Sequence, residues 1–232
     1  MSARSDESLL DNPVWSCLTS RYAHLALGDA RALRFQSNYS PLAAVRDARP
    51  EHVAALLAPV AAGEELSITA VEVGDVPARW EIVGRLRLVQ MIRRDRAPLP
   101  ASGDAVTDLS SGDVDDMLAL VELTHPGPFR RRTVELGNFV GIRRNGRLLA
   151  MAGERMWIGD YREVSAVCTH PDVQGRGLAR SLMAHVINRM LAAGQTPFLH
   201  VLSTNERAIA TYEGLGFARR TEIALTRAQR IA

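Results

Sequence analysis

Cysteine is scarce in this chain of 232 residues. Only Cys17 and Cys168 occur, which is too few for a disulfide scaffold. A Cys168-x-His170 pair is present, but no further metal-ligating residue stands near it in the sequence, so we expect no metal. Two free thiols suit a reducing compartment, and we therefore expect a cytoplasmic protein.

Long hydrophobic runs are also missing. The apolar stretches are far shorter than the roughly 20 residues that cross a bilayer, so we expect no membrane partner. Residues 1–8 include acidic side chains and no apolar core, so we expect no signal peptide. Hydrophobic residues make up 47% of the chain and charged residues 23%, which is the composition of an ordinary globular protein.

A strong net charge and the common nucleotide-binding motifs are missing as well. The formal net charge is +2 and the arginines are dispersed, so we expect no nucleic-acid partner. No Gly-Lys-Ser/Thr sequence occurs, which excludes a Walker loop, and the glycine spacing differs from that of a dinucleotide fingerprint. A different nucleotide-binding enzyme would also need carboxylates placed for Mg²⁺, and the sequence does not indicate them.

The most informative stretch covers residues 164–180. It begins as a strand of small and β-branched residues, which ends at Pro171 because proline cannot extend a ladder. It continues as a glycine loop, Gln174-Gly175-Arg176-Gly177-Leu178-Ala179, and then as a helix to about residue 193. This order is typical of a phosphate site, because glycines let backbone N–H groups approach an anion and the helix start adds unpaired donors.

Two motifs resemble the signatures of the GNAT superfamily of acyl-CoA-dependent N-acyltransferases. The first is Gln174-x-x-Gly177-x-Ala179, which follows a strand and a His-Pro pair. The second is Thr204-Asn205, then Ala-Ile, Tyr212 on the following helix, and Gly216-Phe217. The resemblance covers about residues 105–225. It implies the GNAT fold, an α/β (α+β) fold with a mixed, mostly antiparallel sheet flanked by helices.

The resemblance also implies a site for acetyl-CoA (coenzyme A) as co-substrate. Backbone N–H groups of the glycine loop would hold the pyrophosphate, the end of the central strand would pair with the pantetheine amides, and Asn205 would bind the cofactor arm. The expected cofactor-binding residues are Val167, Cys168, Thr169, Gln174, Gly175, Arg176, Gly177, Leu178, Ala179, Arg180 and Asn205. Two structural alternatives stay open: the loop as a plain tight turn, and Asn205 as a helix N-cap.

Three side chains are candidates for proton transfer. Tyr212 matches the tyrosine that protonates the departing thiolate in this superfamily. Glu163 and His200 are alternative bases for the amine. The structural alternatives are a packed Tyr212 ring, a solvated Glu163 and a partly buried His200 bonded to the backbone. Cys168 is expected to line the strand rather than to act as a nucleophile, since the family transfers the acyl group directly.

The predicted order of elements agrees with this resemblance. After a turn-rich boundary at residues 97–104, the chain reads as helix, hairpin, strand, glycine loop, helix, strand, helix and strand. Before it we predict helices at 13–21, 41–46 and 51–62, a hairpin at 22–35, and strands at 66–73 and 84–94. We therefore divide the chain into a catalytic GNAT domain at 105–232 and a smaller N-terminal α/β half at 1–100. The latter is interpreted as a degenerate GNAT-like half, as in the glycine N-acyltransferase-like branch.

The function predicted from these motifs is N-acetylation. An acetyl group would pass from acetyl-CoA directly to a primary amine in a ternary complex. The alternative is a non-catalytic acyl-CoA-binding sensor of the same fold, against which Tyr212 and Asn205 argue. The acceptor stays open between a small-molecule amine, a protein N-terminus and a lysine, because acceptor pockets are built from variable loops. The sequence does not indicate the oligomeric state.

Overall fold

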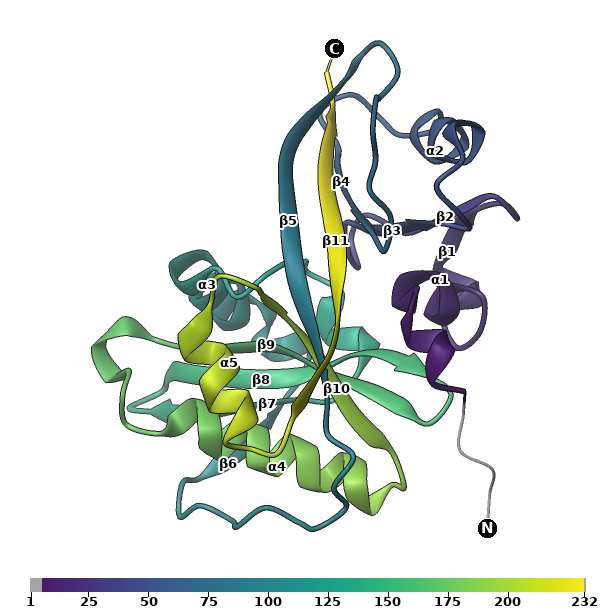
Figure 1. The fold of residues 1–232 in the computed structure, drawn as a ribbon. Helices are drawn as coiled ribbons and strands as arrows, with labels where there is room; N and C mark the ends of the chain where they lie inside the picture. The colour runs from purple at the N-terminus through teal and green to yellow at the C-terminus, as the bar shows by residue number, and fades with distance from the viewer. Residues whose placement is uncertain (1–5, 232) are drawn as a thin grey trace.

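A computed structural model describes residues 6–231 of the chain. These residues form one mixed sheet with the strand order β1-β2-β3-β4-β11-β5-β10-β9-β8-β7-β6 (Figure 1). The strands are β1 (Ala26–Gly28), β2 (Ala32–Phe35), β3 (Leu42–Val45), β4 (Glu65–Thr69), β5 (Trp80–Ile92), β6 (Val106–Leu109), β7 (Phe139–Arg144), β8 (Arg147–Ile158), β9 (Tyr161–Thr169), β10 (Thr196–Leu202) and β11 (Ala218–Arg230). The α-helices are α1 (Pro13–Leu18), α2 (Pro50–Leu57), α3 (Val114–Thr124), α4 (Leu178–Ala192) and α5 (Glu206–Glu213). A mixed, mostly antiparallel sheet flanked by helices confirms the predicted fold class.

Two runs of the chain have the same topology. In each, three antiparallel strands are followed by a helix and by a fourth strand that is parallel to the third. The first unit is β1-β2-β3-α2-β4 (residues 26–69), and the second unit is β7-β8-β9-α4-β10 (residues 139–202). The helix provides the long crossover that a parallel pair of strands requires.

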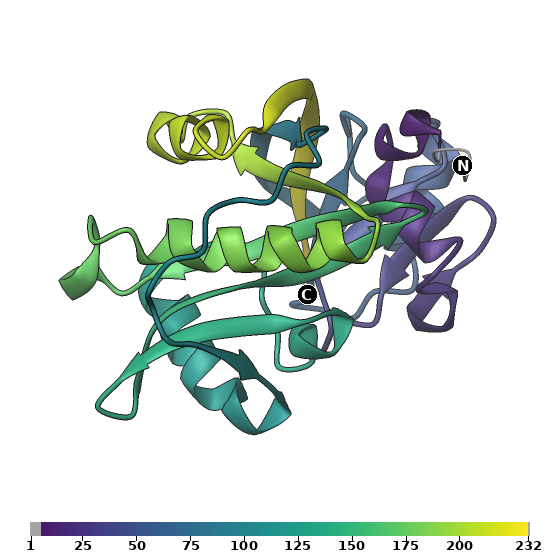
Figure 2. The ribbon, with the colours of Figure 1, turned by 90° about the horizontal axis from the view of Figure 1, so that it is seen from below.

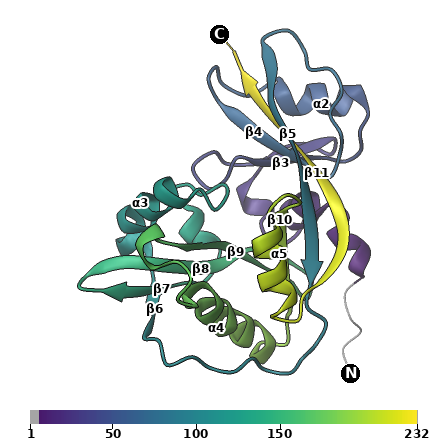
Figure 3. The ribbon, with the colours of Figure 1, turned by 60° about the vertical axis from the view of Figure 1, so that its left-hand side comes forward.

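The two units exchange the long strands that follow them. β5 follows the first unit but pairs with β10 of the second, whereas β11 follows the second unit but pairs with β4 of the first. β5 and β11 also pair with each other, so the strand order is symmetric about them. Figure 3 shows both strands running side by side from one unit to the other. The sheet is therefore continuous across the turn-rich segment at 97–104.

Helices α3 and α4 cover opposite faces of the sheet of the second unit (Figures 1 and 2). Ala150 and Ala152 of β8 belong to the apolar cluster beneath α4, whereas Met151 between them belongs to the cluster beneath α3. This alternation follows from the period of two along a strand. The β7–β8 hairpin is set by Asn145 and Gly146, whose φ values of 51° and 79° are those of the tight turn that Asn-Gly favours.

One predicted helix is wrong. Residues 41–46 contain strand β3, not a helix, and all of its residues are buried. Leu42 and Ala44 pack in the cluster of α1, while Ala43 and Val45 pack in the cluster of α2. A strand that is covered on both faces has a continuous apolar sequence, and such a short run cannot be told from a helix by its periodicity.

The structure bears on one of the two expectations about membranes and secretion. Within residues 6–231, no helix is both long and apolar enough to cross a membrane. The expectation that no signal peptide is present concerns residues 1–8, of which 1–5 lie outside the described residues.

Candidate active site

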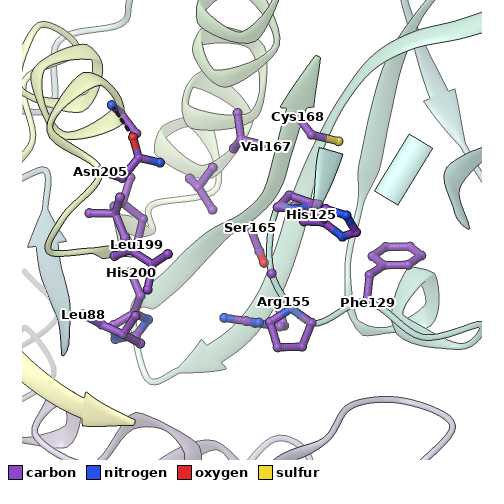
Figure 4. A pocket seen from close by; sticks show the side chains of 18 of the residues that line it. Leu88, His125, Phe129, Arg155, Ser165, Val167, Cys168, Leu199, His200 and Asn205 are labelled. Atoms are coloured by element: carbon purple, nitrogen blue, oxygen red, sulfur yellow. Dashed lines mark hydrogen bonds between the residues drawn. The ribbon is translucent and has the colours of Figure 1, made fainter. Parts of the chain in front are cut away.

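The candidate site lies where β9 and β10 separate. These parallel strands pair at Tyr161 with Thr196 and at Glu163 with Phe198, and their pairing ends there. Beyond this point both strands line a cavity of about 1170 Å³. In Figure 4, Leu199, His200 and Asn205 lie on one side of this cavity. Val167 and Ser165 lie on β9, and Cys168, His125 and Phe129 lie beyond them.

A bulge shapes the wall that β9 gives to the cavity. Ala166 has a φ of 52°, in the left-handed region, and the register between β8 and β9 shifts here. The shift leaves Ala166 and Val167 without register partners on β8, and both residues line the cavity. At the strand end, the hydroxyl of Thr169 is buried without a hydrogen-bond partner among the described residues. An unpaired buried hydroxyl next to a bulge that lines the cavity fits an amide-bearing ligand such as pantetheine.

The glycine loop lies at the other end of the cavity. Gly175 and Gly177 have φ values of 76° and 80°, which other residues rarely adopt, and Gly177 is the N-cap of α4. A Cβ built at either glycine would meet no atom within 4 Å, so the space in front of the loop is open. Open space at the start of a 15-residue helix fits an anionic group such as pyrophosphate.

The structure brings nearly all of the predicted site residues together. The cavity is lined by Glu163, Val167, Cys168, Thr169, Gln174, Gly175, Gly177, Leu178, Ala179, Arg180, His200, Asn205 and Tyr212. Arg176 is exposed and does not line it. The roles of these residues stay predictions.

Helix α5 carries Asn205 and Tyr212 to one side of the cavity. The Oδ1 atom of Asn205 accepts a hydrogen bond of 3.1 Å from the backbone N–H of Ala208, so this side chain caps the helix and leaves its amide N–H groups for a ligand. The ring of Tyr212 packs edge-on against Phe217, with 6.4 Å between the ring centroids. Burial raises the pKa of Tyr212 to about 12, so its phenol is protonated at neutral pH.

Glu163 is at the centre of a buried network. Its carboxylate accepts two hydrogen bonds of 2.8 Å from Arg155, and it lies 2.8 Å from Nδ1 of His200. Burial opposes ionisation of Glu163, but the Arg155 guanidinium and the hydrogen bond from His200 outweigh it and hold the pKa of this carboxyl below its ordinary value. A carboxylate in such a network is a weak proton acceptor, so its surroundings favour a positioning role.

Gln90, which the sequence did not single out, fixes the state of His200. Arg220 donates to Oε1 of Gln90 at 2.9 Å, so the Gln90 amide nitrogen faces Nε2 of His200 at 3.0 Å. That nitrogen can only donate, so Nε2 accepts and the ring proton lies on Nδ1, toward Glu163. Gln90 is fully buried on β5, which precedes the predicted domain boundary. The available signal was one amide inside the apolar run Leu-Val-Gln-Met-Ile.

The surroundings of Cys168 and the arrangement of possible metal ligands bear on two further expectations. Burial raises the pKa of the Cys168 thiol to about 11, so it is not a thiolate at neutral pH and is a poor nucleophile. Across the described residues 6–231, no group of three or more His, Cys, Asp and Glu side chains is arranged to hold a metal ion.

Comparisons with known proteins agree with this geometry. The family described as FR47-like protein matches residues 139–225. A crystal structure of a putative acetyltransferase from the GNAT family of Novosphingobium aromaticivorans is 35% identical, with a TM-score of 0.86; the match covers 96% of this chain and 99% of that one.

Two relatives match about half of the chain or less. The [ribosomal protein bS18]-alanine N-acetyltransferase of Escherichia coli (strain K12) is 28% identical over 125 residues, which are 51% of this chain and 83% of the relative. The N-alpha-acetyltransferase RimI of Mycobacterium tuberculosis is 33% identical over 99 residues, 40% of this chain and 61% of the relative. The full-length likeness to the Novosphingobium protein decides the family: this chain is an acyltransferase that belongs to the GNAT family of N-acetyltransferases.

Proposed function

We propose that this protein transfers the acetyl group of acetyl-CoA directly to a primary amine, with both substrates bound together. One observation carries the proposal: the open space before Gly177 and the opening between β9 and β10 belong to the same cavity. A pyrophosphate at the glycine loop and a pantetheine arm along β9 would bring a thioester to the separation point of the strands.

The proposed roles follow from the surroundings of each residue. The backbone N–H of Val167, in the bulge of β9 that lines the cavity, would donate to the thioester carbonyl, which stabilises the developing negative charge. Tyr212, protonated at neutral pH, would give its proton to the departing thiolate. The buried Cys168 thiol supports direct transfer over an acyl-enzyme route. The non-catalytic sensor alternative is not favoured, because the named relatives are acetyltransferases.

The cofactor site is tested with Gly177→Ala and with Gly194→Ala as its matched control. Both glycines have positive φ, 80° and 77°, and open space at Cβ, but Gly194 does not line the cavity. Both variants should lose about 1–2 kcal/mol of stability from the left-handed backbone. Only Gly177→Ala should weaken acetyl-CoA binding in calorimetry, by about tenfold or more. Equal affinities in the two variants would contradict the proposed cofactor site.

We propose further that residues 1–100 are a degenerate GNAT-like half and that residues 105–232 carry the cofactor site. The repeated order of strands, helix and parallel strand supports this relationship, which is also the arrangement expected in the glycine N-acyltransferase-like branch. The first unit has no glycine between β3 and α2, and α2 begins at a proline after an uncapped Arg49. It therefore lacks the features that hold a pyrophosphate.

The acceptor side of the cavity is where this chain differs from its shorter relatives. Those relatives are named for alanine and N-alpha acetylation of proteins, which supports a protein N-terminus among the candidate acceptors. Pro13, Pro41, Leu42, Glu65 and Leu86 also line the cavity, however, and they lie before the predicted domain boundary. The two cysteines, both free in the structure, support the proposed cytoplasmic location.

A further inference from the structure

We infer that the acceptor subsite is the face of β5 and β11 that lines the cavity, and that it takes a primary amine attached to an apolar body. This inference rests on the proposed function. It names the substrate class of the same site, and it assigns the two exchanged strands a role in selecting the acceptor.

The registers place four apolar side chains on one face. Leu88 lies opposite Ile223, and Leu86 lies opposite Leu225. Residues two apart on a strand point to the same face, and all four line the cavity. Leu86 remains 38% exposed, which is unusual for a large apolar side chain inside a cavity wall. These side chains form a continuous apolar surface beside the separation point of β9 and β10, ready to bury an apolar group.

The charges around the cavity argue against a polycationic acceptor. Its lining carboxylates are Glu65 and Glu163. Both oxygens of Glu65 accept from Arg227 at 2.7 Å, and Glu163 is bonded to Arg155 and His200. No lining carboxylate is therefore left unpaired among residues 6–231. A polyamine or a lysine-rich peptide would meet paired acids and additional arginines, which repel it.

A panel of amines tests the proposed class of acceptor directly. Octylamine and phenethylamine should be acetylated with kcat/KM at least tenfold above that of spermidine, measured by release of free CoA. Leu86→Asn should raise KM for octylamine about tenfold and leave acetyl-CoA binding unchanged. Leu27→Asn is the matched control, because Leu27 is similarly exposed, at 40%, and lies outside the cavity.

Three results would overturn the inference: faster turnover of spermidine, no turnover of either apolar amine, or an unchanged KM in Leu86→Asn. A series of acyl-CoA donors tests whether the apolar face binds the acyl chain of the donor rather than the amine. If Leu86→Asn impairs octanoyl-CoA but not the apolar amines, the face binds the acyl chain instead. Failure of acetyl-CoA to bind at all in calorimetry would contradict the proposed function rather than the acceptor class.

A second inference comes from a different observation, the hydrogen-bond partners of the bases that line the cavity. Glu65, Glu163 and His200 are each bonded to neighbouring side chains, and the Cys168 thiol stays protonated. His125 is exposed, makes no side-chain hydrogen bond or ion pair to another residue in the described part of the chain, and lines the cavity near Phe129 (Figure 4). We propose that His125 accepts the proton of the amine.

The placement and the proton balance both fit this role. His125 follows α3 in the left-handed region, with a φ of 46°, which places the ring at the start of the loop that borders the cavity. The charged or titratable residues that also line the cavity include Arg130, Arg155, Glu163 and Cys168. As the C–N bond forms and the C–S bond breaks, the amine proton passes to the imidazole and the Tyr212 proton to sulfur. Solvent then takes the proton from His125 and returns one to Tyr212.

The test uses His125→Asn, because asparagine tolerates the left-handed backbone but cannot accept a proton near neutral pH. We expect kcat to fall by about 10²–10⁴-fold. KM for acetyl-CoA should not change. His24→Asn, an exposed histidine outside the cavity, is the control. A His125→Asn enzyme with kcat within threefold of the parent overturns the assignment.

Discussion

Oε1 of Glu163 lies 2.8 Å from Nδ1 of His200, at the point where β9 and β10 stop pairing. Glu163 is the last residue of β9 in register with β10, and His200 is two residues beyond its partner Phe198. Their hydrogen bond therefore ties the two strands together at the base of the opening. Arg155 on one side and Gln90 on the other hold the pair in place, so one buried network reaches from the second unit to the exchanged strand β5.

The first prediction concerns the charge balance of this network. Glu163→Gln leaves the buried guanidinium of Arg155 without its counter-ion, and we expect a loss of about 3–5 kcal/mol of unfolding free energy, measured in urea. The double variant Glu163→Gln, Arg155→Met removes the unpaired charge and should recover much of the loss. A double variant no more stable than Glu163→Gln would contradict the account.

The second prediction concerns pH. Folding lowers the pKa of Glu163 from 4.5, so its contribution to stability is fully present above pH 4.5 and is lost as the pH falls toward the folded-state value of about 2. Urea titrations at pH 7, 5 and 4 should show the stability difference between the parent and Glu163→Gln shrinking only below about pH 4.5. A difference that shrinks between pH 7 and 5 would point to another group.

The third prediction concerns Gln90, which lies in the first part of the chain but bonds to the site. Gln90→Leu removes the donor to His200 and the acceptor of Arg220, and it leaves buried polar groups unpaired. We expect a loss of about 1–3 kcal/mol, together with a lower kcat. The Gln90 amide also donates to the backbone carbonyl of Leu10 at 2.9 Å. Gln229→Leu is the control, because the Gln229 amide donates to a backbone carbonyl as well, that of Gly63, but lies outside the cavity. Equal kcat values in the two variants would show that Gln90 has no influence on turnover.

The fourth prediction concerns Tyr212. Tyr212→Phe keeps the ring that packs on Phe217 and removes the phenol proton. We expect kcat to fall by about 10²–10⁴-fold with stability and acetyl-CoA affinity nearly unchanged, the pattern of an interaction made mainly in the transition state. Turnover within about twofold of the parent at saturating substrates would mean that another group protonates the thiolate.

The parts of the site that the sequence predicted are those that neighbouring residues build. Residues 169–180 form a strand end, a glycine loop and a helix start within one continuous stretch, so their order alone places them together. The same holds for Asn205 and Tyr212, which are two turns apart on one helix and therefore share a face.

The errors and omissions come from long-range pairing. The burial of β3 on both faces depends on α1 and α2, and an apolar run of that length carries no sign of it. Gln90 and His200 are 110 positions apart, and only the pairing of β5 with β10 makes them neighbours. His125 is followed by Pro-Gly-Pro, a sequence that predicts a turn but does not predict what the turn faces.

By itself, then, the sequence determined the fold class, the family resemblance and the strand, glycine loop and helix at one end of the cavity, because local hydrogen bonding and helix geometry act within short stretches. The tertiary structure decided the rest: the exchange of β5 and β11, the locked state of His200, and the apolar face of Leu86, Leu88, Ile223 and Leu225. These features arise from backbone hydrogen bonds between distant strands. A shift of one residue in such a register would turn every side chain to the other face, and no short turn joins these distant strands to fix it locally.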